Sequence, residues 1–145
     1  MKKVSIIHGP NLNMLGTREK EYYGDFTLDE LNDHIIEQKE NCELSFYQNN
    51  SEGEIVTYIQ SCKENKIDAI VINAGAYTHT SIAIRDALLS AEIPFIEVHI
   101  SNVYSREPFR RESYLSDIAI GVISGFGKES YTMAVKYFNS YFNTK

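Results

Sequence analysis

The hydrophobic and polar positions along the chain divide it into two kinds of segment. Short apolar runs are typical of buried strands, whereas an apolar residue at every third or fourth position is typical of an amphipathic helix. The strand-like runs are Val4–Ile7, Leu44–Tyr47, Ala69–Ile72, Phe95–Val98 and Ile118–Ile123. Helical patterns occupy most of the segments between them, so the sequence predicts alternating strands and helices.

Two capping boxes mark predicted helix starts. In a capping box, a Ser or Thr side chain and a Glu three residues later each bond the other's backbone N–H. Thr27 and Glu30 fit the first box, and Ser51 and Glu54 fit the second. The apolar faces that follow are Leu28, Leu31, Ile35 and Ile36 in the first helix, and Ile55, Ile59 and Cys62 in the second.

The alternation predicts an α/β fold in which a parallel sheet carries helices on both faces. Two further helices are predicted over Ser81–Ser90 and Lys128–Phe142, and His99–Asp117 is a long polar connection. Ala69–Ile72 is apolar on both of its faces, as a central parallel strand should be. The length of 145 residues and the lack of repeats or linkers favour a single domain over residues 1–145.

Composition limits the class of partner. A hydrophobic share of 43% and a charged share of 23% are ordinary for a globular protein. The net charge of −6 argues against nucleic acid. It still allows an anionic small-molecule substrate, because a few arginines can reverse the sign locally. Arg106, Arg110 and Arg111 lie within six positions, and they form either such an anion site or an ordinary solvated charge run.

Cysteines and apolar segments bear on the compartment. Cys42 and Cys62 are too few and too far apart for a disulfide framework or a zinc site, so we expect free thiols and a cytoplasmic protein. The apolar run near the N-terminus is too short for a signal-peptide core. No stretch approaches the ~20 apolar residues of a membrane span, so no membrane partner is expected.

Histidines gather where the predicted strands stop, which is where parallel α/β sheets bind ligands. His8, His79 and His99 lie at such ends. His34 lies within a predicted helix and is expected to be an ordinary surface residue. A metal site built from the three strand-end histidines lacks acidic or Cys ligands at a suitable spacing.

Glu97, His99 and Ser101 occupy alternate positions, so they share one face if the strand continues. Burying these groups is costly without partners. They form either a structural hydrogen-bond network or a site in which Glu97 holds His99 in one tautomer for use as a general acid.

Two other segments have open interpretations. His79 leads into a predicted helix, whose N-terminus would disfavour its protonated form, so it is either a neutral ligand-binding group or an incidental part of a helix cap. The segment Leu15–Gly24 is charged, ends in Gly and follows the first strand. It is either a lid over the site or an ordinary mobile loop.

Several chemistries lack their motifs. The sequence has no glycine-rich dinucleotide or phosphate-binding motif, no nucleophile elbow, and no Lys at a strand end for an imine. Acid–base chemistry without a metal or cofactor remains. Such chemistry is typical of a lyase or isomerase that acts on a small carboxylate. The alternatives are a flavin carrier and a phosphorylation receiver. A receiver needs clustered Asp at strand ends, whereas this chain has His, Asn and Glu there.

Four blocks of sequence, in order and at consistent spacing, make the chain resemble the type II 3-dehydroquinate dehydratases (type II dehydroquinases) along essentially its whole length. The blocks are Gly9–Glu19, Tyr23-Gly24, Asn73–Ser81 and Glu97–Val103, the last continuing through Arg106 and Phe109 to Arg110 and Arg111.

The resemblance implies a flavodoxin-like three-layer sandwich with a five-stranded parallel sheet, and a dodecamer built as a tetramer of trimers. It implies a hydro-lyase that needs no cofactor and removes water reversibly from 3-dehydroquinate to give 3-dehydroshikimate. The reaction serves the shikimate pathway of aromatic amino-acid biosynthesis or quinate breakdown. In this family the elimination is anti and passes through an enolate, with no imine.

The resemblance also implies catalytic roles. Tyr23 would be the base that removes a proton beside the ketone, and Arg18 would activate its phenolate. Asn11 would stabilise the enolate oxygen through a water molecule. His99 would protonate the departing hydroxyl, with Glu97 orienting it.

Substrate-binding positions follow in the same way. They are Asn73, His79, Ile100, Ser101 and Arg110, with Arg106 nearby in a less defined role and Asp86 completing a neighbouring subunit's site. Arg110 would take the substrate carboxylate in a bidentate fork. Tyr22 stands beside Tyr23, and the following Gly24 fixes Tyr23 as the family's base.

Overall fold

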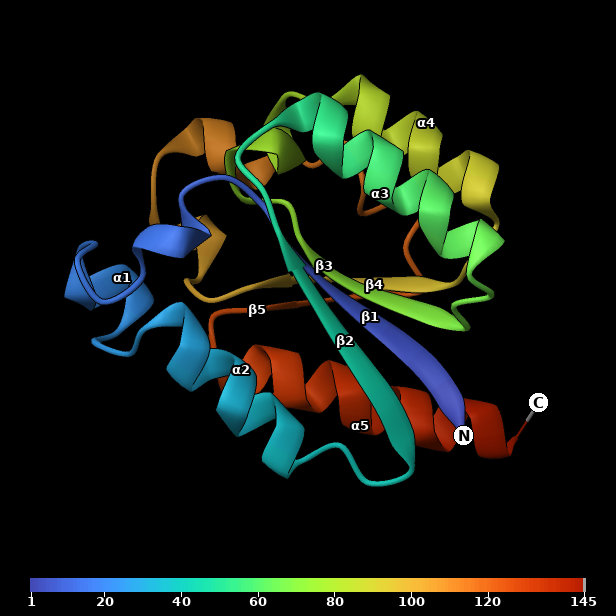
Figure 1. Cartoon of the computed structure of the whole chain (residues 1–145). Coiled ribbons are helices and arrows are strands. Elements are labelled where there is room, and N and C mark those ends of the chain that lie inside the picture. The colour runs from blue at the N-terminus through green and yellow to red at the C-terminus, as the bar shows by residue number, and fades with distance from the viewer. Residues whose placement is uncertain (145) are drawn as a thin grey trace.

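The computed structural model describes residues 1–144, which form a sheet between two layers of helices (Figure 1). The strands are β1 (Lys2–His8), β2 (Cys42–Gln48), β3 (Ala69–Asn73), β4 (Phe95–His99) and β5 (Gly121–Ser124). The helices are α1 (Lys20–Tyr23), α2 (Leu28–Glu37), α3 (Glu52–Glu64), α4 (Ile82–Ala91) and α5 (Glu129–Asn143). Within residues 1–144, no helix is long and apolar enough to cross a membrane.

The sheet has the order β2-β1-β3-β4-β5, and every neighbouring pair is parallel. This is the flavodoxin-like strand order, so the predicted three-layer α/β fold is confirmed. The order reverses between β1 and β3, which opens a crevice outside their carboxyl ends. In Figure 1 those ends face the side of the molecule on which α1 lies.

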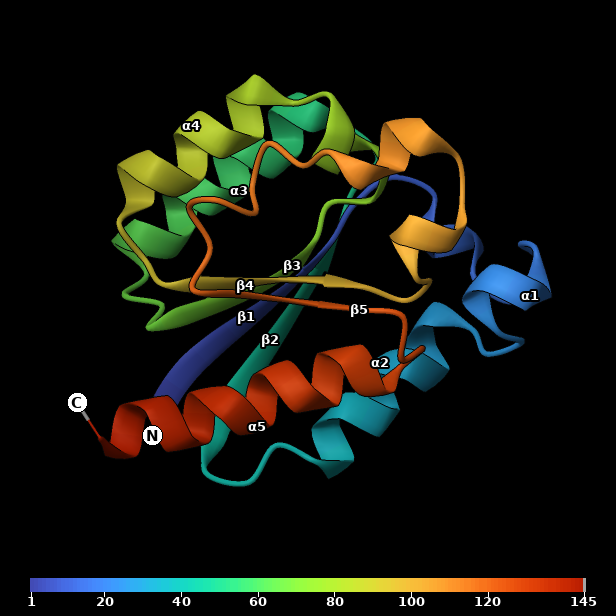
Figure 2. The same ribbon diagram turned by 180° about the vertical axis from the view of Figure 1, so that it is seen from behind.

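Two apolar cores fill the space between the layers. Figures 1 and 2 show α2 and α5 on one face of the sheet and α3 and α4 on the other. Alternate strand residues serve the two cores, so Ile6 and Val71 pack toward α2 and α5 while Ile7 and Ile72 pack toward α3 and α4. All residues of β3 are buried, as its two-sided apolar pattern predicts, and all residues of β4 are buried as well, including the polar Glu97 and His99.

The two predicted capping boxes have different outcomes. The box at α2 forms completely, with Thr27 and Glu30 bonding each other's backbone. At α3 only half of it forms, because Ser51 Oγ accepts the Glu54 N–H at 3.3 Å while the Ser51 N–H donates to Asn49 Oδ1 at 2.8 Å. The side chain of Asn49 thus replaces that of Glu54.

The fifth strand begins at Gly121, three residues later than the predicted Ile118. The N–H groups of Ile118 and Ala119 both donate to the Leu115 carbonyl at 3.1 Å, which closes a turn. Both side chains pack on the α3/α4 core from that turn. The apolar run predicted burial correctly, but burial does not require extended backbone.

His34 is not the ordinary surface residue that the sequence predicted. Its Nε2 contacts a carboxylate oxygen of Glu129, so it joins α2 to the first turn of α5. The side chain is partly buried between these helices.

A buried hydrogen-bond chain ties the ends of β1 and β3 to the helices beneath them. Burial lowers the pKa of His8 to about 4, against a partial opposing effect of its bond to Asn32, so the imidazole is neutral near pH 7. His8 Nε2 donates to Asn32 Oδ1 at 2.8 Å, which leaves Nδ1 to accept from the Tyr131 hydroxyl at 3.1 Å. That hydroxyl in turn accepts from Asn73 Nδ2 at 3.0 Å.

Tyr131→Phe should destabilise the protein, because it leaves His8 Nδ1 and one Asn73 N–H buried without this partner. We expect the free energy of unfolding in urea to fall by roughly 2–4 kcal/mol. Tyr137→Phe on the same helix is the matched control, since its ring is 52% exposed, and it should change stability by no more than about 0.5 kcal/mol. Equal effects of the two substitutions would contradict the stabilising role of the hydrogen bonds that the Tyr131 hydroxyl makes to His8 and Asn73.

Neutral His8 also makes stability depend on pH. In the unfolded chain His8 gains its proton near the ordinary pKa of 6.5, whereas in the folded protein it does so only near 4. Protonation therefore favours the unfolded state between these values, so stability is full above about pH 6.5 and falls by roughly 3 kcal/mol toward pH 4 through this group. Urea titrations of wild type and His8→Asn across this range should show a shallower decline in the variant, and identical slopes would refute the assignment.

Candidate functional site

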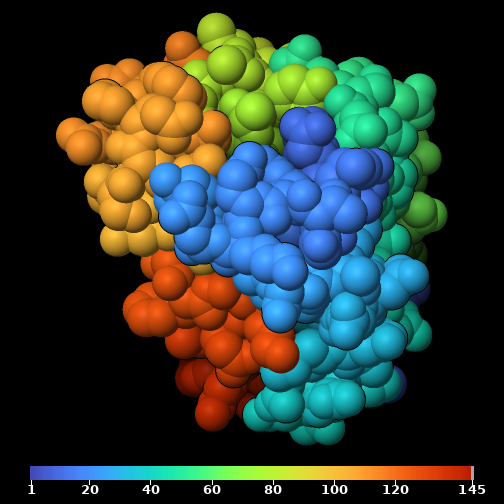
Figure 3. All heavy atoms as spheres, turned by 90° about the vertical axis from the view of Figure 1, so that its left-hand side faces the viewer, coloured from blue at the N-terminus to red at the C-terminus, as the bar shows by residue number. Residues whose placement is uncertain are grey.

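A pocket lies outside the carboxyl ends of β1, β3 and β4, beneath residues 15–24, which we call the lid segment. Ten of the twelve predicted site residues line it: Asn11, Arg18, Tyr23, Asn73, His79, His99, Ile100, Ser101, Arg106 and Arg110. Its other lining residues, which were not predicted as site residues, are Pro10, Leu12, Gly75, Ala76 and Val103. In Figure 3 the blue lid segment lies directly against the orange segment that follows β4.

Close backbone packing shapes the floor of the pocket. A side chain at Gly9 would place a Cβ only 2.4 Å from the Ala74 carbonyl oxygen, so no other residue fits there. Gly75 has φ +59, and a Cβ there would lie 3.1 Å from the Pro10 carbonyl oxygen. Asn11 itself has a left-handed conformation with φ 70, which Asn tolerates better than most residues. Gly9 after β1 and Gly75 after β3 thus allow the backbones at the ends of these two strands to pack against each other.

Glu97 and His99 form a buried pair at the end of β4. His99 Nε2 lies 2.5 Å from Glu97 Oε2, and both side chains are buried. Burial alone would raise the pKa of Glu97, but the hydrogen bonds and charge of its partners outweigh it and hold this pKa below its usual value. An ionised carboxylate only accepts, so Nε2 carries a proton and Nδ1 is the ring nitrogen left for chemistry.

Two serines, which the sequence analysis missed, complete the partners of Glu97. Ser113 Oγ accepts the N–H groups of Leu115 and Ser116 at 3.0 Å, so its own proton is free to point to Glu97 Oε1 at 2.9 Å. Ser116 Oγ donates to the same oxygen at 2.7 Å. The spacing of these serines within the polar connection carried no periodic signal that could have identified them.

His79 is held neutral, but for a different reason from the one predicted. It ends the 3-10 turn Gly75–His79, and Ser81, not His79, caps α4. Burial is the main cause that lowers the pKa of His79, and the nearby His99 and Arg110 act in the same direction. Its Nδ1 donates to the Glu112 carbonyl at 2.7 Å, which leaves Nε2 as an acceptor.

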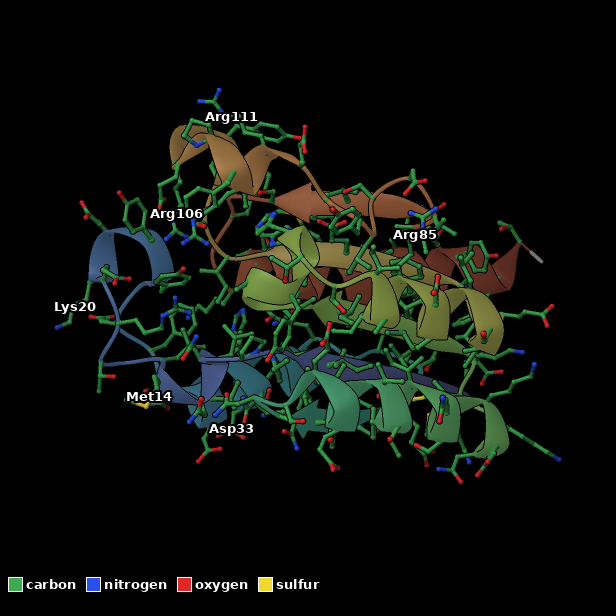
Figure 4. The ribbon with its side chains drawn as sticks, turned by 90° about the horizontal axis from the view of Figure 1, so that it is seen from above. Met14, Lys20, Asp33, Arg85, Arg106 and Arg111 are labelled. Carbon is green, nitrogen blue, oxygen red and sulfur yellow. The ribbon has the colours of Figure 1, made fainter. Side chains whose placement is uncertain are left out.

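The lid tyrosine meets two arginines. The Arg18 guanidinium lies over the Tyr23 ring, with its carbon 3.7 Å from the ring centroid. Arg106 Nη1 donates to the Tyr23 phenolic oxygen at 2.7 Å. Figure 4 shows Arg106 directed toward the lid, whereas Arg111 points away from it. Arg106, whose role the sequence left less defined, is therefore the arginine at the phenolic oxygen.

Arg110 forms a bidentate pair with a protein carboxylate. Nε and Nη2 of Arg110 bond the two oxygens of Glu107 at 3.0 and 3.4 Å. With Arg18 and Arg106, Arg110 gives the pocket three cationic side chains in a protein whose net charge is −6. The pocket is therefore suited to an anionic ligand.

Three other predicted residues have distinct positions. Asn73 is buried, and both of its amide groups have partners. Its Nδ2 donates to the Tyr131 hydroxyl, and its Oδ1 accepts the Gly75 N–H at 3.1 Å. Ser101 Oγ accepts from Arg106 Nη1 at 3.3 Å. Asp86 is exposed on α4 and does not line the pocket of its own chain. Nowhere in residues 1–144 are three or more His, Cys, Asp or Glu side chains grouped to hold a metal ion.

Comparison with known proteins gives one consistent result. The sequence model described as dehydroquinase class II matches residues 2–139. A catabolic 3-dehydroquinase of Clavispora lusitaniae is 56% identical, covering 97% of this chain and 99% of the relative. A 3-dehydroquinate dehydratase of Legionella pneumophila is 51% identical, with 94% and 95% covered.

Solved structures agree with the sequence relatives. The crystal structure of a type II dehydroquinase from Butyrivibrio crossotus superposes with a TM-score of 0.92 at 48% identity, covering 95% of this chain and 97% of that one. The chain therefore belongs to the class II dehydroquinase family.

Proposed function

We propose that this chain is a type II 3-dehydroquinate dehydratase, a hydro-lyase that catalyses the reversible anti elimination of water from 3-dehydroquinate. One observation carries the proposal: a phenol with a guanidinium at its oxygen, Tyr23 with Arg106, lines the same pocket as the oriented His99. A base and an acid that reach the same pocket are what a two-step elimination needs.

In the first step, Tyr23 as phenolate takes a proton from the carbon beside the substrate ketone. A free tyrosine phenol has a pKa of about 10, so the base form needs help near neutral pH. Arg106 supplies a positive donor at the phenolic oxygen and Arg18 a second positive charge over the ring. Both favour the phenolate over the neutral phenol.

The electron pair of the broken C–H bond moves into an enolate. Asn11 lines the pocket, and it would stabilise the enolate oxygen through a water molecule, as an oxyanion-hole group does. In the second step the enolate collapses and the C–O bond to the leaving hydroxyl breaks. His99 gives the Nδ1 proton to that hydroxyl, which departs as water, while Glu97 keeps the ring oriented through Nε2.

Substrate binding uses the cationic side of the pocket. Arg110 is proposed to take the substrate carboxylate together with the backbone N–H groups of Ile100 and Ser101, and the incoming carboxylate would compete with Glu107 for the guanidinium. His79 Nε2 would accept a hydrogen bond from a substrate hydroxyl, because Nδ1 is committed to Glu112. Asn73 lines the same wall and also fixes the turn at Gly75.

We further propose that residues 1–145 act as a single catalytic domain within a cytoplasmic homododecamer, arranged as a tetramer of trimers. The exposed position of Asp86 on α4 supports a role in a neighbouring copy, since it does not reach the pocket of its own chain. No metal or organic cofactor takes part in the proposed steps.

Tyr23→Phe should abolish dehydration of 3-dehydroquinate, because phenylalanine offers no phenolate to take the proton. We expect kcat to fall by roughly 10²–10⁴-fold. The measurement is the rate at which the enone absorbance of the product grows. Tyr22→Phe is the matched control beside it and should retain activity. If Tyr22→Phe were the inactive variant, the base would be misassigned.

Glu97→Gln should impair the acid step, because the protonated form of His99 loses its anionic partner and its fixed orientation. We expect kcat to fall by about 10²-fold or more and the alkaline limb of the kcat profile to move to lower pH. Steady-state kinetics across pH measures both effects. Unchanged kcat with an unmoved alkaline limb would remove His99 from the mechanism.

A further inference from the structure

The residue before the proposed base contacts the same arginine as the base does. The guanidinium carbon of Arg106 lies 4.4 Å from the centroid of the Tyr22 ring. The two tyrosine rings meet edge to face, with centroids 6.4 Å apart and planes 77° from parallel. One turn of α1 therefore places an aromatic face against the guanidinium and a phenolic oxygen at its end.

Within the described part of the chain, Arg106 is nearly buried and has no carboxylate in hydrogen-bond contact to balance its charge. Its side chain is only 7% exposed, and the nearest carboxylate oxygen, on Glu107, lies 3.7 Å from Nε. Nε has no hydrogen-bond partner among residues 1–144. Nη1 divides its bonds between Tyr23 at 2.7 Å and Ser101 at 3.3 Å. A desolvated guanidinium without a bonded carboxylate gains most from an aromatic face.

We propose that Tyr22 is a positioning residue for the elimination: its ring holds the Arg106 guanidinium at the phenolic oxygen of Tyr23 by a cation–π contact. The proposal rests on the proposed function in taking Tyr23 as the base. The Tyr22 hydroxyl has no part in it, so the ring alone should suffice. Tyr22 thereby acts on the reaction through Arg106 and touches no reacting atom.

Other charged and titratable groups also face Tyr23 and remain in every variant below. They are Arg18 over the ring, Arg110, His79 and His99 across the pocket, and Glu107 beside Arg106. Because these groups stay constant, a change caused at position 22 is assigned to the Tyr22–Arg106 contact. Replacement of Tyr22 changes no formal charge near neutral pH.

The test compares Tyr22→Leu with Tyr22→Phe in the pH dependence of kcat/KM for 3-dehydroquinate. In Tyr22→Leu, the acid limb, which reports ionisation of the base, should move to higher pH by roughly half a unit to one unit. Activity below the limb should then fall about three- to tenfold, with the plateau nearly unchanged. Tyr22→Phe should keep the wild-type limb. A limb that moves equally in both variants, or in neither, overturns the proposal.

A merely structural role of Tyr22 predicts a different result, namely an equal loss at every pH without a shift of the limb. A fluorinated phenylalanine at position 22 keeps the ring shape and weakens the negative face of the ring. It should move the limb in the same direction as Tyr22→Leu, even if the leucine variant folds poorly. A fluorinated variant with the limb of Tyr22→Phe would also overturn the proposal.

A direct readout separates this proposal from the proposed function. The ultraviolet absorbance of tyrosinate titrates without turnover, and the component missing from Tyr23→Phe belongs to Tyr23. That component should move to higher pH in Tyr22→Leu and stay in place in Tyr22→Phe. If the protein did not convert 3-dehydroquinate, the proposed function would fail while this titration still decided whether Tyr22 holds Arg106 at Tyr23.

Discussion

The buried carboxylate of Glu97 is the group on which much of the site depends. It lies within the sheet, where an unpaired charge would be very costly. Its stability requires three donors, from His99, Ser113 and Ser116. The two serines draw the polar connection after β4 back over the α3/α4 core, where Leu115 is fully buried. The need to satisfy one carboxylate therefore positions both His99, the proposed acid, and the segment that carries Arg110.

A second polar side chain, His8, is buried at the same edge of the sheet, and it carries no charge. His8 lies at the end of β1 and is kept neutral by burial, so each of its nitrogens has one role and one partner. That chain ends on Asn73, whose other amide atom holds the turn at Gly75. One strand end thus uses a neutral histidine to build the floor, and another uses a carboxylate to orient His99, the proposed acid. Both are histidines at strand ends in the sequence, and only their surroundings separate the two roles.

The sequence predicted the features that depend on periodicity and on motifs. It predicted fewer of the contacts between side chains that are distant in sequence. The five strands and the helices between them were predicted from apolar patterns, because burial of one or both faces of an element requires apolar residues at regular positions in the sequence. The face shared by Glu97 and His99 followed from the two-residue period of a strand. The partners of Glu97 within the polar connection did not, because hydrogen bonds from an irregular loop have no period.

The cationic contacts show the same limit. Any of three arginines near the pocket could have met the phenol, and the family resemblance favoured Arg18. The structure places Arg18 over the ring and Arg106 at the oxygen, a difference of side-chain geometry that no spacing encodes. His79 shows a related case, since its neutral state was predicted from a helix terminus and arises mainly from burial.

The separation of the base from its activating charge has a consequence for the reaction. Tyr23 follows β1, Arg106 follows β4, and the two are 83 positions apart in sequence. The guanidinium can favour the phenolate only while the lid segment lies against the segment after β4. The proposed base and its cation therefore form one unit only through the contact between these two segments.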